Sequence, residues 1–214
     1  MRVFVVGDGM YDVGECRNQV IDGPDLPALP EIIQKLLPRS KDVQFVCSTI
    51  KEIRTRQSGG AGPLNKKKVI AAVLQASRHK ADAVVFVIDR DGDRQRMQEL
   101  NAGRREISPQ DFLPIALGMA VETFDAWMIA DAGALRHVEG CERAEAHPSP
   151  ESLDGGRGTQ QHPKDYAIRQ VGADRLWDKY ACIAKFIDIA HLERVCPQGF
   201  QPFANEVRSN LRYD

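Results

Sequence analysis

Cysteine is scarce in this sequence, and its few copies are scattered. None of the five cysteines is spaced from another as C-x-x-C, and their number is odd. This distribution argues against a disulfide framework and against a zinc ribbon, so the sequence predicts a reducing, cytoplasmic setting. The positions are Cys16, Cys47, Cys141, Cys182 and Cys196.

Long hydrophobic runs are also missing. Residues 1–6 are too short for the apolar region of a signal peptide, and Gly7 and Asp8 interrupt the run at once. No later apolar run approaches the roughly 18 residues that a membrane helix needs. We therefore expect no membrane among the partners of this chain.

Neither sign of charge is in excess. The 214 residues include 29 basic and 30 acidic side chains, which leaves a formal net charge of -1. This balance excludes a global attraction to nucleic acid, so a polyanionic partner would have to be held by a local patch or through metal ions. The 43% of hydrophobic residues is enough for an ordinary core.

The chain is organised around residues 83–93, which read AVVFVIDRDGD. The apolar part is rich in valine and isoleucine, which is typical of a strand buried on both faces of a parallel sheet. Helices between the first three predicted strands give the alternation βαβαβ, which favours parallel pairing with right-handed crossovers. Strands are expected at residues 2–6, 43–50 and 84–88, helices at residues 26–37 and 69–76, and a fourth strand or apolar connector at residues 112–120.

The rest of the chain is expected to be mainly helical. Residues 123–135 are predicted as one helix, and residues 139–164 as a flexible surface loop because they are rich in Pro, Gly, Ser and His. We expect an α/β core over residues 1–138. We also expect a helical extension over residues 165–214 that packs on the sheet within the same structural unit.

Carboxylates follow two of the predicted strands. Asp8 and Asp12 come after the first strand, and Asp89 and Asp91 after the third. If the strand order is 2-1-3-4, the first and third strands are neighbours and these side chains share one space at the carboxyl edge. Asp89 and Asp91 should leave the strand on the same side and repel each other unless a cation lies between them. Such oxygen ligands suit Mg²⁺ or Mn²⁺.

Two other interpretations of these residues fit less well. The run from Gly7 to Asp12 begins like the G-x-G-x-x-G of dinucleotide-binding folds, but Asp12 stands at the third glycine position. Phosphatases of the haloacid dehalogenase type also use a D-x-D. Their motif normally follows the first strand, whereas the D-x-D of this chain follows the third predicted strand.

The only basic cluster of the sequence lies in the glycine-rich stretch 54–68, which has no acidic residue. We expect it to hold phosphate groups without reading bases, although a run of this kind is often only a solvated surface. Its basic residues are Arg54, Arg56, Lys66, Lys67 and Lys68.

The placement of the carboxylates resembles the Toprim domain, the catalytic module of topoisomerases, primases and overcoming-lysogenization-defect nucleases. That domain has an acidic residue after its first strand and a D-x-D after its third, where this chain has Asp89-Arg90-Asp91. Asp8 to Asp12 looks like the E-G-x-x-E element of the nuclease-like branch, with Asp in both Glu positions.

The chain resembles more closely, and nearly end to end, a bacterial Toprim-like family of unknown function. Members carry E-x-W-L-L-A-D, which residues 125–131 match with Asp125 in place of Glu. They also carry a P-K element, matched by Pro163 and Lys164, and a C-P-x-F stretch, matched by residues 196–200 with one extra residue.

The resemblance implies a Toprim-like fold and Mg²⁺-dependent phosphoryl transfer, most simply phosphodiester hydrolysis of DNA or RNA. In this interpretation Asp89, Asp91 and Asp8 bind the metal, and Asp8, Asp12 and Asp125 have catalytic roles. Such families often belong to anti-phage systems. Because Asp replaces Glu repeatedly, the alternative is a degenerate subunit that binds nucleic acid or a protein partner such as an ATPase. A nucleotide-binding regulator is a third alternative.

Overall fold

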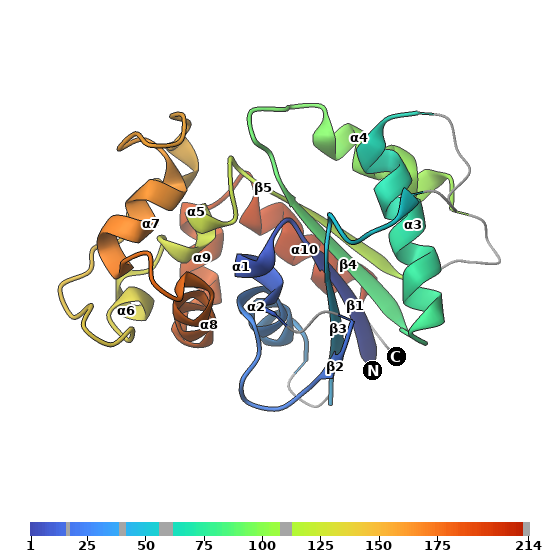
Figure 1. The fold of residues 1–214 in the computed structure, drawn as a ribbon, viewed down its shortest axis with the longest axis horizontal. Coiled ribbons are helices and arrows are strands. Elements are labelled where there is room, and N and C mark those ends of the chain that lie inside the picture. Colours follow the sequence, from blue (N-terminus) through green and yellow to red (C-terminus); the bar gives the residue numbers. More distant parts are fainter. Residues whose placement is uncertain (16–17, 39–41, 56–61, 108–112, 212–214) are drawn as a thin grey trace.

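A central β-sheet organises the structure (Figure 1). The structure is a computed structural model that describes residues 1–15, 18–38, 42–55, 62–107 and 113–211. Over these residues the sheet has five strands in the order β2-β3-β1-β4-β5. The last four in this order are parallel, and β2 (Val20–Ile21) pairs antiparallel with β3 at one edge. The parallel strands are β3 (Gln44–Thr49), β1 (Arg2–Gly7), β4 (Ala83–Asp89) and β5 (Ile115–Ala120). Their order is the 2-1-3-4 that would bring the first and third predicted strands together, and β2 is an additional strand that was not expected.

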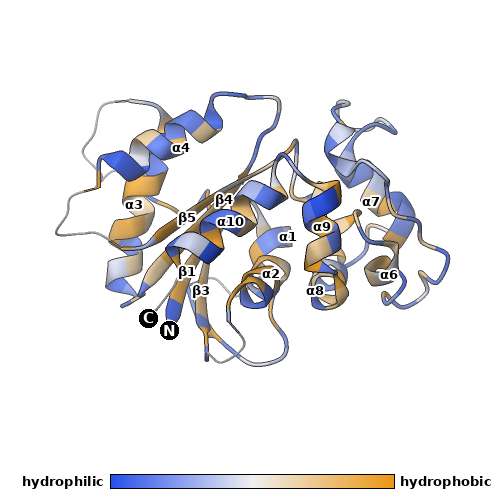
Figure 2. Ribbon diagram, turned by 180° about the vertical axis from the view of Figure 1, so that it is seen from behind, coloured by the Kyte–Doolittle hydropathy of each residue, from blue (hydrophilic) through white to orange (hydrophobic). Residues whose placement is uncertain are grey.

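The alternation of side chains along each strand divides the interior into two cores. Val3 and Val5 of β1 face one core, whereas Phe4 and Val6 face the other. Helices α2 (Ala28–Leu36) and α10 (Phe200–Asn210) pack in the first core, and α3 (Leu64–Arg78) and α4 (Arg96–Arg105) cover the second (Figure 1). The strands are mostly hydrophobic and α4 is mostly hydrophilic, as expected for an outer helix (Figure 2). The fold is therefore α/β, with helices on both faces of the sheet.

Helix α3 begins five residues before the predicted start at residue 69. Its first turn is polar, so apolar periodicity gave no signal there. Contacts with α4 hold this turn: Asn65 donates a hydrogen bond to Glu99 at 2.8 Å, and Lys66 forms an ion pair with Glu106.

The single helix predicted over residues 123–135 is wrong. Two short helices, α5 (Asp125–Met128) and α6 (Ala132–Leu135), stand in its place. Asp131 is extended, and its carboxylate accepts hydrogen bonds from the N–H groups of Gly133 (2.8 Å) and Ala134 (3.3 Å). An N-cap in this position starts a new helix and ends the preceding one.

The C-terminal helices contribute to the same hydrophobic core as the sheet. Buried residues of α7 (Pro163–Val171), α8 (Leu176–Phe186), α9 (Ile189–Val195) and α10 join the core on the α2 face. No described helix is both long enough and apolar enough to span a bilayer.

The segment 139–164 has little regular structure beyond a 3₁₀ turn, η3 (Pro150–Ser152), and the start of α7. It is nevertheless attached to the C-terminal helices by Glu151. The buried carboxylate of Glu151 accepts backbone N–H groups at the start of α10, from Gln198 and Gly199 at 2.7 Å and from Phe200 at 3.4 Å. Glu151 therefore joins the segment to the sheet-packed part of the chain.

Replacing Glu151 by alanine should lower the free energy of unfolding by about 1–3 kcal/mol, because buried backbone N–H groups lose their acceptor. Urea unfolding followed by circular dichroism measures the change. Glu142→Ala, at an exposed position of the same segment, is the matched control. Equal stability of the two variants would contradict the anchoring role of Glu151.

Candidate acidic site

The candidate site lies where β1 and β4 end side by side. The two strands are paired in parallel from Val3 opposite Ala83 to Val6 opposite Phe86. Asp8 directly follows β1, and Asp89 is the last residue of β4. The backbone N–H of Asp89 is close enough to the Asp8 carboxylate to lower its pKa, although burial raises that pKa overall. In the structure, Asp8 and Asp89 therefore meet at the carboxyl edge of the sheet.

Asp12 is brought to the same place by the short helix α1 (Met10–Val13), which turns back over the end of β1. Its buried carboxylate accepts a hydrogen bond from the Gly9 N–H at 3.1 Å. A Cβ atom at Gly7 would lie 2.8 Å from the Asp12 Cβ atom, so only glycine permits this close return of the chain.

Asp125 completes the group from the start of α5 and is also buried. Its carboxylate accepts a hydrogen bond from the hydroxyl of Tyr180, a fully buried residue of α8. Helix α8 contacts both α1 and α5. Tyr180 therefore fixes the orientation of Asp125, a role that its place on the apolar face of the predicted helix did not reveal.

We call Asp8, Asp12, Asp89 and Asp125 the acidic cluster. Burial, followed by the charges of the other three members, raises the pKa of Asp89 well above its ordinary value. Burial and the charges of Asp125 and Asp8 raise the pKa of Asp12 to about 8. The pKa of Asp8 is raised mainly by burial and then by the charge of Asp91. Asp12 therefore retains its proton at neutral pH when no cation is bound.

Asp91 lies at the rim and not inside the cluster. Strand β4 ends at Asp89, and Asp91 has a left-handed backbone with φ of 44°. The alternation that predicted Asp89 and Asp91 on one side therefore does not extend to Asp91. Its exposed carboxylate forms an ion pair with Arg96 at 2.9 Å.

The donor set of the acidic cluster suits a hard divalent cation, because it offers only carboxylate oxygens in a shielded place. The arrangement is not a finished coordination shell: within residues 1–15, 18–38, 42–55, 62–107 and 113–211, no three Asp, Glu, His or Cys side chains converge on one metal position. The carboxylates would have to turn toward one another and release protons to bind an ion. The cluster thus offers the charge and the ligand type that such a cation needs, but not a converged coordination shell.

Two cations act on the cluster through Asp8 and a third lies on Tyr11 of α1, and we call these three the cationic rim. Lys51, just after β3, and Arg96, in α4, both lower the pKa of Asp8. The ammonium of Lys164, at the start of α7, lies 3.7 Å from the ring centroid of Tyr11 in α1. In the sequence, Lys164 was indicated only by its match to the P-K element of the resembled family. No sequence feature indicated Lys51, because its position near Asp8 depends on how β3 pairs with β1.

Two of the five basic residues predicted over residues 54–68 are committed to internal contacts. Lys66 pairs with Glu106, and the Lys68 ammonium donates hydrogen bonds to the carbonyls of Ile50 (2.7 Å) and Ile53. Arg54 is exposed and lines a surface pocket, Lys67 is partly buried, and Arg56 lies outside the described residues. The cations that affect Asp8 are instead Arg96 and Lys51 of the rim.

The chain was compared with models of known protein families, with curated proteins and with solved structures, and none of them matches it. The resemblance to Toprim-like proteins therefore stays a prediction, and the function has to be argued from the site itself.

The raised pKa of Asp12 predicts how the stability of the metal-free protein depends on pH. Because Asp12 binds its proton more tightly in the folded than in the unfolded protein, the free energy of unfolding should fall as pH rises from about 4 to about 8. With a chelator present, Asp12→Asn should reduce the loss of Tm between pH 5 and pH 8.5 by about 3 °C or more. Asp93→Asn, at an exposed position, is the control, and an Asp12→Asn protein with the wild-type pH profile would refute the assignment.

Proposed function

We propose that the acidic cluster binds Mg²⁺ or Mn²⁺ and carries out phosphoryl transfer, with hydrolysis of a nucleic-acid phosphodiester as the reaction. The observation that carries this proposal is the convergence of four carboxylates from separate segments, whose burial and mutual repulsion raise the pKa values of Asp8, Asp12 and Asp89. Such an arrangement destabilises a folded chain, and it is typical of sites that bind a cation or move protons.

In this proposal Asp89 and Asp8 hold the ion, and Asp91 joins them when it leaves Arg96. The bound cation would polarise a phosphoryl oxygen and lower the pKa of a coordinated water. Asp12 is suited to proton transfer, because its pKa of about 8 lies close to neutral pH. Tyr180 keeps Asp125 facing the cluster.

The cationic rim supplies the positive charge that a phosphate group needs beside a carboxylate site. Arg96 can contact phosphate oxygens with two N–H groups at once, whereas Lys51 and Lys164 act as point charges. The rim replaces Lys66 and Lys67 as the candidate for holding the reacting phosphate.

A second function has support in the side-chain arrangement. No three ligands converge on one metal position in the described residues, and Asp stands where the resembled family has Glu at positions 8, 12 and 125. These facts favour a Toprim-like subunit without catalytic activity that binds nucleic acid or a partner such as an ATPase. The two functions make opposite predictions for hydrolysis.

Purified protein should cleave single-stranded or double-stranded DNA or RNA with Mg²⁺ or Mn²⁺, and Asp89→Asn should lower the rate at least about 100-fold, because the cation loses its central ligand. Gel electrophoresis of labelled substrates measures the rate, and Asp93→Asn is the control. Unchanged cleavage by Asp89→Asn would exclude the acidic cluster as the active site.

Cation binding itself can be measured without any substrate. Mn²⁺ at pH 8 should raise the Tm of the wild type by several degrees, because the ion binds only the folded chain, and should not raise that of Asp8→Asn/Asp89→Asn. A Tm increase without hydrolysis would favour the non-catalytic subunit. Equal increases in wild type and variant would place the ion elsewhere.

A further inference from the structure

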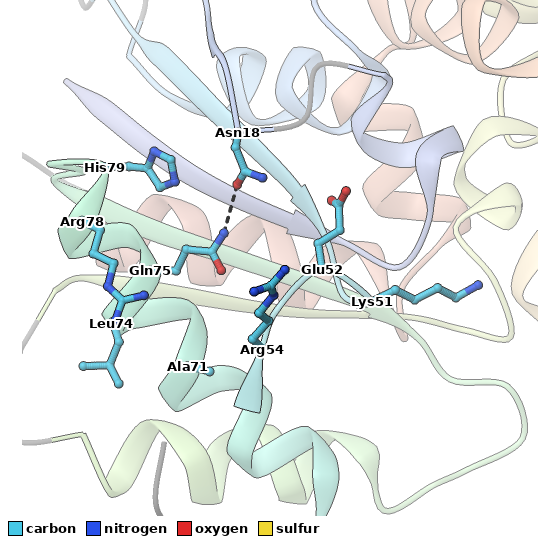
Figure 3. A pocket seen from close by; sticks show the side chains of 9 residues that line it. All are labelled: Asn18, Lys51, Glu52, Arg54, Ala71, Leu74, Gln75, Arg78 and His79. Atoms are coloured by element: carbon cyan, nitrogen blue, oxygen red, sulfur yellow. Dashed lines mark hydrogen bonds between the residues drawn. The ribbon is translucent and has the colours of Figure 1, made fainter. Parts of the chain in front are cut away.

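A surface pocket of about 770 Å³ lies between α3 and the turn after β3 (Figure 3). One wall is a helical stripe of α3, with Ala71, Leu74, Gln75 and Arg78 at spacings of three and four residues. The opposite wall comes from the segment 51–54. We call this the basic pocket. Its volume lies in the range of ligand sites, about 300–1,000 Å³.

Positive charge is in excess on the walls of the basic pocket. Lys51, Arg54 and Arg78 line it and are exposed, and Glu52 is the one carboxylate among the described lining residues. The Glu52 carboxylate accepts hydrogen bonds from the N–H (2.9 Å) and hydroxyl (3.1 Å) of Thr49, so it is directed toward its own turn. An anion is therefore the ligand that this pocket favours, in a chain whose net charge is -1.

The polar groups of the pocket suit phosphates and not bases. Among the described lining residues, His79 carries the only aromatic ring, and that ring is stacked on Phe4 with centroids 5.6 Å apart. Gln75 donates a hydrogen bond to Asn18 at 2.9 Å across the pocket (Figure 3). The described lining residues therefore offer no free aromatic face on which a base could stack, but they offer cationic groups that can contact a phosphate backbone.

The basic pocket continues toward the acidic cluster through Lys51. The Lys51 side chain extends away from the other lining side chains (Figure 3), and its charge lowers the pKa of Asp8. From Ala71 to Arg78 the wall runs about 10 Å along α3. A wall of this length contacts a few neighbouring phosphates of one strand.

We infer that the basic pocket holds the phosphate backbone of one nucleic-acid strand, on the side of the scissile bond next to Lys51. The inference rests on the proposed function, because it names where the substrate of the acidic cluster continues. It assigns to Arg54 and Arg78 phosphate contacts that do not involve the acidic cluster.

The test is the binding of a fluorescent single-stranded oligonucleotide in the presence of EDTA, measured by anisotropy over a series of salt concentrations. Arg54→Gln/Arg78→Gln should weaken binding about tenfold. It should also make the slope of log affinity against log salt less steep by about 1.4, the value for two lost phosphate contacts on a single strand. Arg143→Gln/Arg175→Gln removes two exposed arginines outside the pocket and should bind like the wild type.

The outcomes separate this inference from the proposed function. If the pocket variant binds more weakly but no variant cleaves nucleic acid, the strand site stands and the catalytic proposal fails. If the pocket variant keeps the wild-type affinity and slope, or if the wild type binds no oligonucleotide at low salt, the inference is wrong whatever the cleavage result. Competition by a mononucleotide at the same concentration of phosphate would also overturn it, because a strand site gains its affinity from consecutive phosphates.

Discussion

Parallel pairing of β1 with β4 is the constraint on which the candidate site depends. Because both strands run the same way and end at one edge, the residues that follow them are forced into one place, whatever their charges. Asp8 and Asp89 are therefore held together by the hydrogen bonds of the sheet and by the apolar side chains on its two faces. The free energy of burying those faces outweighs the repulsion between the carboxylates.

The carboxylates also differ from one another in a way that matters for chemistry. Asp12 and Asp125 are buried and fixed by hydrogen bonds from Gly9 and Tyr180, whereas Asp91 is exposed and paired with Arg96. A site with both kinds combines Asp12, a shielded group whose pKa is raised to about 8, with a carboxylate that is open to solvent. Carboxylates in such different environments are common to enzymes that use several acidic residues.

The parallel strands could be predicted from the sequence, because strongly apolar runs and turn residues mark where strands begin and end. The meeting of Asp8 with Asp89 followed only on the assumption that the first and third strands are neighbours, which the sheet has. What could not be predicted depends on contacts between distant segments. Tyr180 was recognisable only as an apolar-face residue, and Lys51 only as an exposed lysine, until the fold placed one on Asp125 and the other near Asp8. The break at Asp131 was missed because apolar spacing continues across it, whereas a single capping carboxylate decides where α6 begins. Lys66 and Lys68 were counted as a basic cluster because sequence does not show their partners in other segments.

The contact of Tyr180 with Asp125 and of Lys164 with Tyr11 has a consequence for the time at which the site is completed during synthesis. A nascent chain that has emerged only as far as β5 already contains all four strands of the parallel sheet and both Asp8 and Asp89. It still lacks Asp125, the hydroxyl that orients Asp125, and the ammonium that lies over Tyr11. The ribosome therefore releases the last parts of the site after the sheet, so that a product truncated at β5 would carry Asp8, Asp12 and Asp89 without the fourth carboxylate of the cluster.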